Sequence, residues 1–93
     1  MNATTNYYLD AVKDIPQGIK KEVEFSFAIS DRIYQLLKEK GMTQKELAKK
    51  MNKTEAEVSV WVSGQHNFTL RTLARISVIL GEDLIQVKTN PNC

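Results

Sequence analysis

The sequence predicts an all-α fold, a compact bundle of helices around one small core, and three features indicate it. Apolar residues recur at intervals of three and four, which is the period of an amphipathic helix. Glycines follow three of the apolar runs, where they can end helices. The pair Thr43 and Glu46 is repeated as Thr54 and Glu57, and this spacing is typical of a capping box that begins a helix.

Composition predicts a single domain. The 93 residues are 42% hydrophobic and 26% charged, which suffices for one modest core. We expect that domain at residues 16–87, between an N-terminal tail at 1–15 and a frayed C-terminal tail at 88–93. No signal-peptide pattern and no apolar run of membrane length is present, and Cys93 has no partner for an internal disulfide. We therefore expect a cytoplasmic protein.

The first predicted helix begins near Pro16, a residue that fits the first turn of a helix, and ends at Gly41. Its apolar positions are Ile19, Val23 and Phe27, then Ile29, Ile33, Leu36 and Leu37. The phase of the pattern slips between residues 25 and 29. The sequence is thus compatible with one long helix or with two abutting ones.

Two short helices follow, each opened by one of the capping boxes. Their predicted buried stripes are Leu47, Ala48 and Met51 in the first and Val58, Trp61 and Val62 in the second. Between them Asn52 is one of the few non-glycine residues that tolerate a left-handed backbone. We therefore expect a tight turn at Asn52 and a core position for Trp61.

The rest of the chain predicts one more helix. Gly64 ends the preceding helix, and Phe68 returns to the core from the loop. Thr69 caps a helix that runs to Gly81 and carries Leu70, Leu73, Ile76 and Leu80 on one face. Residues 83–87 have possible strand character.

Residues 44–63 have the pattern of a helix-turn-helix. Two helices that cross steeply on a short turn need a small residue where they meet, and Ala48 supplies it. The residues of this unit that are left facing away from the core are Thr54, Glu55, Ala56, Ser59, Val60 and Ser63.

The segment "MTQKELAKKMNKTEAEVSVWVSG" resembles the central motif of the phage-repressor-like (XRE) helix-turn-helix proteins. The segment "SGQHNFTLRTLARISVILG" is similar to the following helix of the HigA-type antitoxins within that group. The resemblance covers roughly residues 26–87. Asn52 stands where the family carries glycine, and Val60 stands where it often carries a basic or polar residue.

The resemblance implies a lambda-repressor-like DNA-binding domain of five or so helices, with residues 54–63 laid into the major groove. It also implies that Gln44 contacts a phosphate, which suits an amide at a helix N-terminus. Lys45 and Lys53 can add charge to the same contacts. Charge follows the motif, since residues 38–80 hold eight lysines or arginines against four glutamates, although the whole chain is only +2.

Other side chains are candidates for contacts to DNA. Ala56 and Val60 offer methyl groups suited to thymine, and Ser59 can donate to a base or a phosphate. Glu55 could accept from a cytosine amino group or discourage non-specific binding, whereas Glu57 is best explained as part of its capping box.

The loop after this helix offers two more candidates. His66 and Asn67 could donate to the DNA backbone, or they could form a solvated loop in which Asn67 supports a turn. As the chain's only histidine, His66 lacks partners for a metal site. We expect no metal and no cofactor.

Enzymatic chemistry is poorly supported, because the chain has no glycine-rich phosphate loop, no cysteine pair and no nucleophile near a histidine. The leading hypothesis is a DNA-binding repressor that acts as a homodimer on a palindromic site. Its dimer surface would be residues 83–87 or the exposed end of the last helix.

The HigA-type resemblance further implies an antitoxin that represses its own operon and neutralises a small ribonuclease toxin. Tyr7, Tyr8 and Leu9 could dock on the toxin, or residues 1–25 could instead cover the domain's own core. The alternatives are a stand-alone phage-repressor-like regulator and a protein-interaction module that does not bind DNA.

Overall fold

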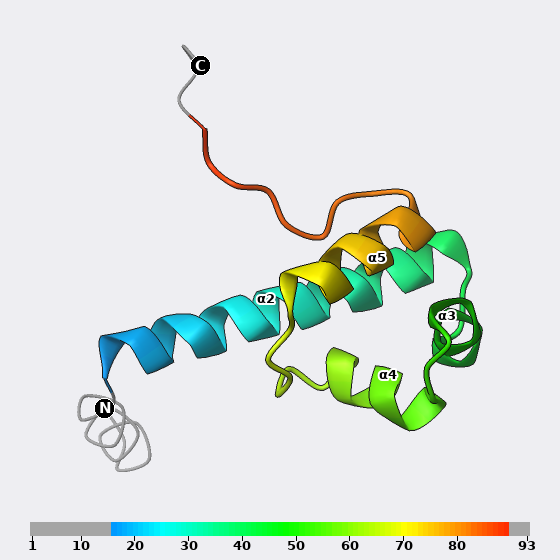
Figure 1. The fold of residues 1–93 in the computed structure, drawn as a ribbon, viewed down its shortest axis with the longest axis horizontal. Coiled ribbons are helices and arrows are strands. Elements are labelled where there is room, and N and C mark those ends of the chain that lie inside the picture. The colour runs from blue at the N-terminus through cyan, green and yellow to red at the C-terminus, as the bar shows by residue number, and fades with distance from the viewer. Residues whose placement is uncertain (1–15, 90–93) are drawn as a thin grey trace, which may run out of the picture.

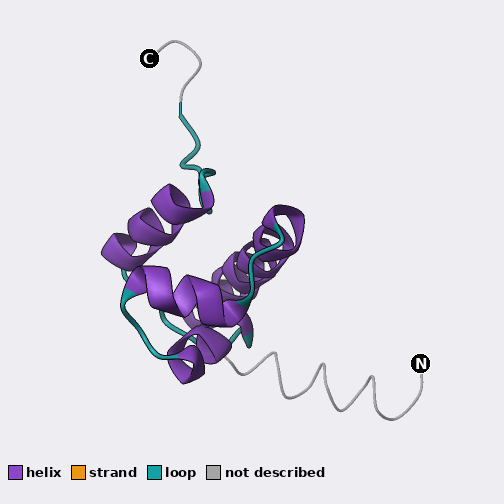
Figure 2. Ribbon diagram, turned by 90° about the vertical axis from the view of Figure 1, so that its right-hand side faces the viewer, coloured by secondary structure: helices purple, strands orange, loops and turns teal. Residues whose placement is uncertain are grey.

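The computed structural model describes residues 16–89, which form four helices joined by short loops (Figure 1). In chain order they are α2 (Gln17–Lys40), α3 (Gln44–Met51), α4 (Glu55–Val62) and α5 (Leu70–Leu80). Figure 2 shows helices and loops only over this part of the chain. The predicted all-α fold is confirmed. The predicted roles of Tyr7, Tyr8, Leu9 and Cys93 fall outside the described residues.

Helix α2 is one continuous helix, so the slip in its apolar pattern does not break it. It ends at Gly41, whose φ of 63° is left-handed and whose N–H donates to the carbonyls of Leu37 and Lys38. Only its C-terminal half is buried, because α4 and α5 pack there. Its N-terminal half extends past the core (Figure 1). The exposed apolar side chains of that half are Ile19, Val23, Phe25 and Phe27.

The exposed side chains count against the hypothesis that residues 1–25 cover the domain's own core. Phe25 is 61% exposed and Ile19 is 50% exposed. The described part of the segment therefore does not act as a cover.

The core is built from all four helices. Its most deeply buried side chains are Ile33, Leu36, Leu47, Met51, Val58 and Ile76. Trp61 is only 4% exposed, which confirms its predicted core position. The buried hydroxyl of Ser30 in α2 donates to the carbonyl of Trp61, so the one buried polar side chain among the described residues is satisfied and ties α2 to the end of α4.

Helix α5 confirms most of its prediction and corrects one residue. Thr69 caps it by accepting from the backbone N–H of Thr72, and Leu73, Ile76 and Leu80 are buried. Leu70 is 73% exposed, so its predicted place on the buried face is wrong. As the first residue of the helix, Leu70 lies 60° or so around the axis from Leu73, on the side that faces outward.

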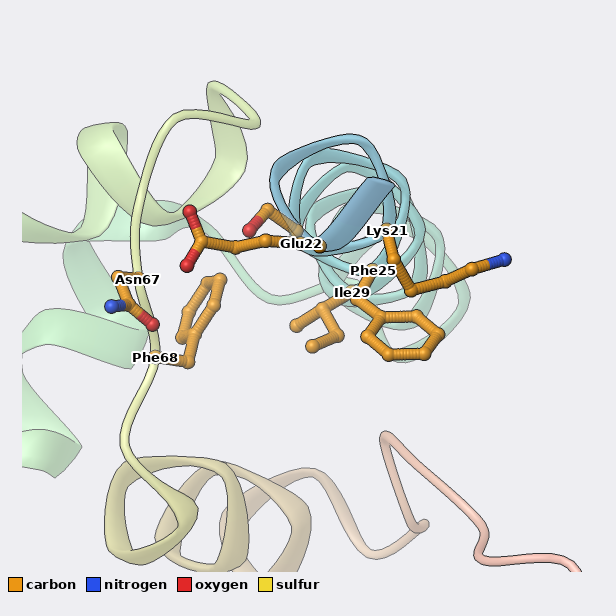
Figure 3. A pocket seen from close by; sticks show the side chains of 8 residues that line it. Lys21, Glu22, Phe25, Ile29, Asn67 and Phe68 are labelled. Carbon is orange, nitrogen blue, oxygen red and sulfur yellow. The ribbon is translucent and has the colours of Figure 1, made fainter. Parts of the chain in front are cut away.

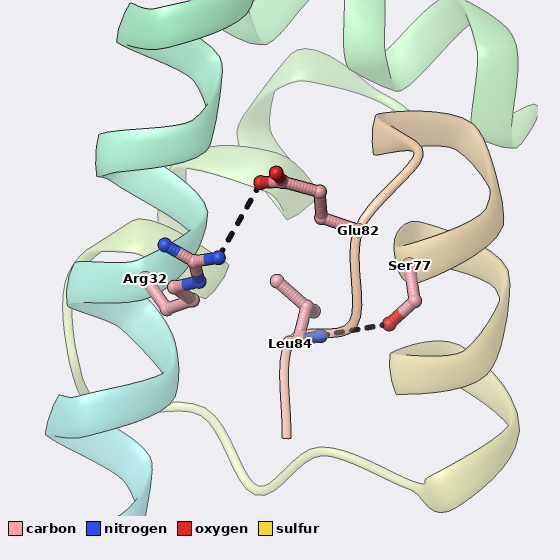
Figure 4. Close-up of polar contacts among 4 residues, drawn as sticks. All are labelled: Arg32, Ser77, Glu82 and Leu84. Atoms are coloured by element: carbon pink, nitrogen blue, oxygen red, sulfur yellow. Dashed lines mark hydrogen bonds and ion pairs between the residues drawn. The ribbon is translucent and has the colours of Figure 1, made fainter. Parts of the chain in front are cut away.

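Residues 83–87 do not form a strand, because no other strand among the described residues offers them a partner. They run instead as an extended segment beside α5 (Figure 1). The N–H of Leu84 donates to the Ser77 hydroxyl at 3.0 Å, and Glu82 pairs with Arg32 of α2 at 3.4 Å (Figure 4). The buried side chain of Leu84 completes this attachment.

Gly64, after α4, should not tolerate a side chain. Its φ is 88°, and a Cβ built on it would clash with the ring of Phe27. We expect Gly64→Ala to lower the free energy of unfolding by about 1–3 kcal/mol, through overpacking and backbone strain together. Urea unfolding measures the change.

Gly18→Ala is the matched control, because a Cβ on Gly18 meets nothing within 4 Å. It should leave stability unchanged or raise it slightly, since alanine favours a helix. Equal stability of both variants would show that Phe27 moves aside freely.

Candidate nucleic-acid interface

The candidate interface rests on α3 and α4, and both helices begin with the predicted capping boxes. The Thr54 hydroxyl accepts from the N–H of Glu57 at 3.1 Å, and the Glu57 carboxylate accepts from the N–H of Thr54 at 2.7 Å. Thr43 and Glu46 repeat this arrangement at the start of α3. Each of these two helices therefore starts at a fixed residue, so the register of the residues that follow is also fixed.

The turn between the two helices is the one the sequence predicts. Asn52 has φ 57° and ψ 44°, the only left-handed non-glycine residue among those described. The N–H of Lys53 donates to the carbonyl of Ala48 at 2.9 Å, which closes the end of α3. Asn52 thus adopts the left-handed conformation that glycine usually supplies at the end of a helix.

The outer face of α4 is exposed as predicted. Its residues are Thr54, Glu55, Ala56, Ser59, Val60 and Ser63. Val60 is 47% exposed and shares this face with Ala56, while Val58 and Trp61 on the opposite side are buried. Lys45 and Lys53 are also exposed, near the starts of α3 and α4.

A contact that the sequence did not predict joins the two helices. The hydroxyl of Ser59 in α4 donates to Oε1 of Gln44, the first residue of α3, at 3.0 Å. Two predicted DNA contacts are therefore a single unit. With its oxygen held by Ser59, the Gln44 side chain has its amide NH₂ left as the donor, and Ser59 keeps its lone pairs as acceptors.

A second unpredicted contact braces the turn. Arg75 of α5 donates to the carbonyl of Met51, the last residue of α3, at 3.0 Å. The last carbonyls of a helix have no hydrogen-bond partner within the helix, and the guanidinium group supplies one. Its positive charge is also favourable at the C-terminus of a helix, which carries a partial negative charge. No local sequence signal marks this pair, because the two residues are 24 positions apart.

His66 and Asn67 occupy different environments. His66 is half-buried and packs its ring edge-on to Phe68, with centroids 4.7 Å apart, and beside Trp61 at 6.3 Å. It also lines a groove of about 250 Å³ with Lys53, Val60 and Thr72. His66 therefore lies at the margin of the outer face of α4.

Asn67 lies in the same loop, opposite the N-terminal half of α2 (Figure 3). There it lines a groove of about 420 Å³ with Lys21, Glu22 and Phe25. The structure thus sets Asn67 apart from the other predicted site residues.

The capping hydrogen bonds change the acidity of Glu57. Hydrogen bonding from the backbone N–H of Thr54 lowers its pKa below the ordinary 4.5, and the Thr54 hydroxyl and nearby Lys53 act in the same direction against a partial desolvation. The cap holds Oε2 of the Glu57 carboxylate, so Glu57 has a structural role at the start of α4. The other glutamate of this helix, Glu55, takes no part in the cap.

This cap predicts a pH dependence of stability. A lowered pKa in the folded state stabilises the fold above the ordinary value of 4.5, and that contribution is lost as the pH falls through the lowered pKa. We expect Glu57→Gln to be slightly less stable than the native chain at neutral pH, and the difference to disappear in acid. Denaturant unfolding at pH 7 and in acid measures it.

Glu55→Gln is the control, because Glu55 takes no part in a capping box. A difference between Glu57→Gln and the native chain that is the same at both pH values would contradict the assignment.

Two capped helices joined by a tight turn, the second with an exposed outer face, form a helix-turn-helix unit. A family model described as "Helix-turn-helix" matches residues 33–87, more than half of the chain. The chain belongs to this XRE-type helix-turn-helix family and is a DNA-binding regulator. The family is a regulatory domain and not a catalytic one.

Solved structures give a partial likeness. The chain is similar to "FeII HppE in Complex with Substrate form 1" and to hydroxypropylphosphonic acid epoxidase from S. wedmorenis, each at 25% identity and a TM-score of 0.61. The match covers 63% of this chain but only 34% and 31% of those chains. This chain therefore spans about a third of their length, and their chemistry is not carried over. No curated protein matched the chain.

No helix within residues 16–89 is long and apolar enough to cross a membrane.

Proposed function

We propose that the protein is a cytoplasmic, sequence-specific transcriptional repressor that binds a palindromic operator as a homodimer, with α4 in the major groove. The observation that carries the proposal is the hydrogen bond between Gln44 of α3 and Ser59 on the exposed outer face of α4. It preorganises a backbone-contacting side chain and a base-contacting side chain in one unit. Preorganised groups lose less entropy on binding than free ones do.

The residues divide by role. Gln44, Lys45 and Lys53 contact phosphates, with the Gln44 NH₂ as donor. Ser59, whose hydrogen is committed to Gln44, accepts from the amino group of an adenine or cytosine. The other residues proposed to face DNA are Thr54, Glu55, Ala56, Val60, Ser63 and, at the margin, His66, whereas the position of Asn67 gives it little support as a contact.

Fluorescence anisotropy tests the proposal, with a duplex from the gene's own upstream region and a scrambled duplex at two salt concentrations. We expect tighter binding to the native duplex. We also expect the logarithm of the binding constant to fall by about 0.9 per neutralised phosphate for each tenfold rise in salt concentration. Equal, negligible binding to both duplexes would overturn the proposal in favour of a protein-interaction module.

We further propose that the repressor is an antitoxin that also neutralises a small ribonuclease. Support comes from the N-terminal half of α2, which lies outside the family match and exposes Phe25 and Ile19. A groove beside it, lined by Phe25, Ile29 and Phe68, is open to an apolar side chain.

Co-expression tests this second step. A small ribonuclease encoded beside the gene should arrest growth alone, and the native chain should relieve the arrest. Phe25→Glu should fail to relieve it while still binding operator DNA, and Gln35→Glu, which adds the same charge elsewhere on α2, should relieve it. If Phe25→Glu relieves the arrest as well as the native chain and Gln35→Glu do, the ribonuclease does not bind at Phe25. If the neighbouring protein does not arrest growth, the chain is a stand-alone repressor.

A further inference from the structure

The groove of about 250 Å³ beside α4 holds two fixed charges and one that changes near neutral pH. Its polar lining is Lys53 from the turn before α4, Glu57 from α4, His66 from the following loop and Thr72 from α5. A lysine is positive throughout this range. The capping hydrogen bonds hold the pKa of Glu57 below its ordinary value, so its carboxylate is negative. Of these residue types only histidine gains or loses a proton between about pH 5 and about pH 8.

The charged side chains of α5 do not alter this balance. Arg71 and Arg75 are the charged residues of that helix, and neither lines the groove. The guanidinium of Arg75 donates instead to the carbonyl of Met51. Because the fixed charges of Lys53 and Glu57 are opposite, protonation of His66 changes the charge of the groove from neutral to positive.

The ring of His66 is held by packing, while its nitrogens are able to donate to a ligand. The ring lies edge-on to Phe68, with centroids 4.7 Å apart, and 6.3 Å from Trp61. Within residues 16–89 neither ring nitrogen has a hydrogen-bond partner, and no unpartnered side-chain nitrogen there is buried. Both nitrogens of His66 therefore reach solvent.

A DNA duplex on the outer face of α4 would pass this groove, because Val60 belongs to that face and also lines the groove. A protonated imidazole offers two N–H donors and a positive charge, which match the oxygens of a phosphate. A neutral imidazole offers one donor and no charge. A backbone phosphate beside His66 therefore favours the protonated ring.

We infer that His66 is a proton-linked contact to the DNA backbone, so that the chain takes up a proton at this side chain when it binds its operator. The inference rests on the proposed function, since it adds regulation by pH to the same DNA-binding surface. Because the complex holds the proton more tightly than the free chain, affinity is highest in acid. It is lost as the pH rises through the midpoint at which the ring titrates in the complex.

Fluorescence follows this proton directly. Trp61 and His66 are the only tryptophan and the only histidine of the chain, and their ring centroids are 6.3 Å apart. An imidazolium quenches indole emission more strongly than a neutral imidazole does. Emission of the full chain should therefore fall as the pH is lowered, with one midpoint that His66→Gln abolishes. A saturating operator duplex should move the native midpoint to higher pH.

Anisotropy on the operator duplex measures the same proton through binding. Native affinity should rise about tenfold between about pH 8 and about pH 5.5, since a midpoint displaced by one pH unit is a tenfold change in affinity. The ratio of affinities should match the displacement that fluorescence measures. The protonated ring adds one phosphate contact, so the plot of log binding constant against log salt should be steeper in acid by about 0.9.

Two substitutions fix the charge of this position. His66→Gln is neutral at every pH, so its salt dependence should be the shallow one at both pH values. His66→Lys is positive at every pH, so its salt dependence should be the steep one at both, and circular dichroism checks that both chains fold. The terminal amine, which titrates in a similar range, is present in every variant. A rise in affinity that persists in His66→Gln would overturn the inference.

The native chain separates this inference from the proposed function. A chain that binds neither operator nor scrambled duplex at either pH overturns the proposed function, and the inference with it. Specific operator binding with the same affinity and the same salt dependence at both pH values overturns the role of His66 alone.

Discussion

Replacement of Trp61 by alanine is expected to lower the free energy of unfolding by about 3–5 kcal/mol, the cost of removing a large buried aromatic. Trp61 of α4 is 4% exposed, its ring lies beside His66 and Phe68 of the following loop, and its carbonyl accepts from Ser30 of α2. A small domain has only about 5–15 kcal/mol of stability, so the variant should be largely unfolded at moderate temperature. Because the variant lacks the chain's only tryptophan, circular dichroism and not fluorescence should follow the transition.

Val60→Ala is the control within the same helix. Val60 neighbours Trp61 but is 47% exposed, and its loss should change stability by less than about 1 kcal/mol. If Trp61→Ala stays as stable as Val60→Ala, the core does not depend on the packing of α4.

Ser59→Glu is expected to abolish specific operator binding while the thermal midpoint stays nearly unchanged. The new carboxylate would face phosphates and base edges and would no longer hold Gln44, so affinity should fall to that for a scrambled duplex, a loss of about a thousandfold or more. Stability should hold because Ser59 is exposed and its bond to Gln44 is on the surface. Anisotropy and thermal unfolding of the same sample measure the two effects.

Two further variants separate charge from the hydrogen bond. Ser59→Ala removes the bond to Gln44 without adding charge and should weaken binding less. Gln35→Glu adds the same charge opposite the buried residues of α2 and should bind normally. Native affinity in Ser59→Glu would show that α4 is not the reading helix.

The boundaries of the helices were predictable because they depend on local chemistry. The threonine–glutamate boxes fixed the starts of α3 and α4, Asn52 fixed the turn, and Gly41 fixed the end of α2. Each of these signals acts over three or four residues. Backbone groups at helix ends need partners, and few side chains can supply them.

What the sequence did not predict depends on residues far apart in the chain. The Gln44–Ser59 and Arg75–Met51 contacts join different helices, and no periodicity encodes them. The exposure of Leu70 also escaped prediction, because a leucine at the right spacing reads as buried until the neighbouring helices are placed. The exposure of the N-terminal half of α2 escaped prediction for the same reason, because its apolar pattern continues beyond the part of the helix that α4 and α5 cover.

The contact of Phe27 with Gly64 has a thermodynamic consequence. Phe27 belongs to the exposed stretch of α2 and is half-exposed itself. Its ring nevertheless packs against Gly64, in the loop that follows α4. On the proposed function, in which α4 binds DNA, a ligand that displaces this ring is expected to change the affinity for DNA, because the ring packs against the residue that follows α4. By reciprocity, DNA would then change the affinity for that ligand by the same factor. Two binding events on this small domain would therefore share one free-energy cycle, with Phe27 as the element common to both.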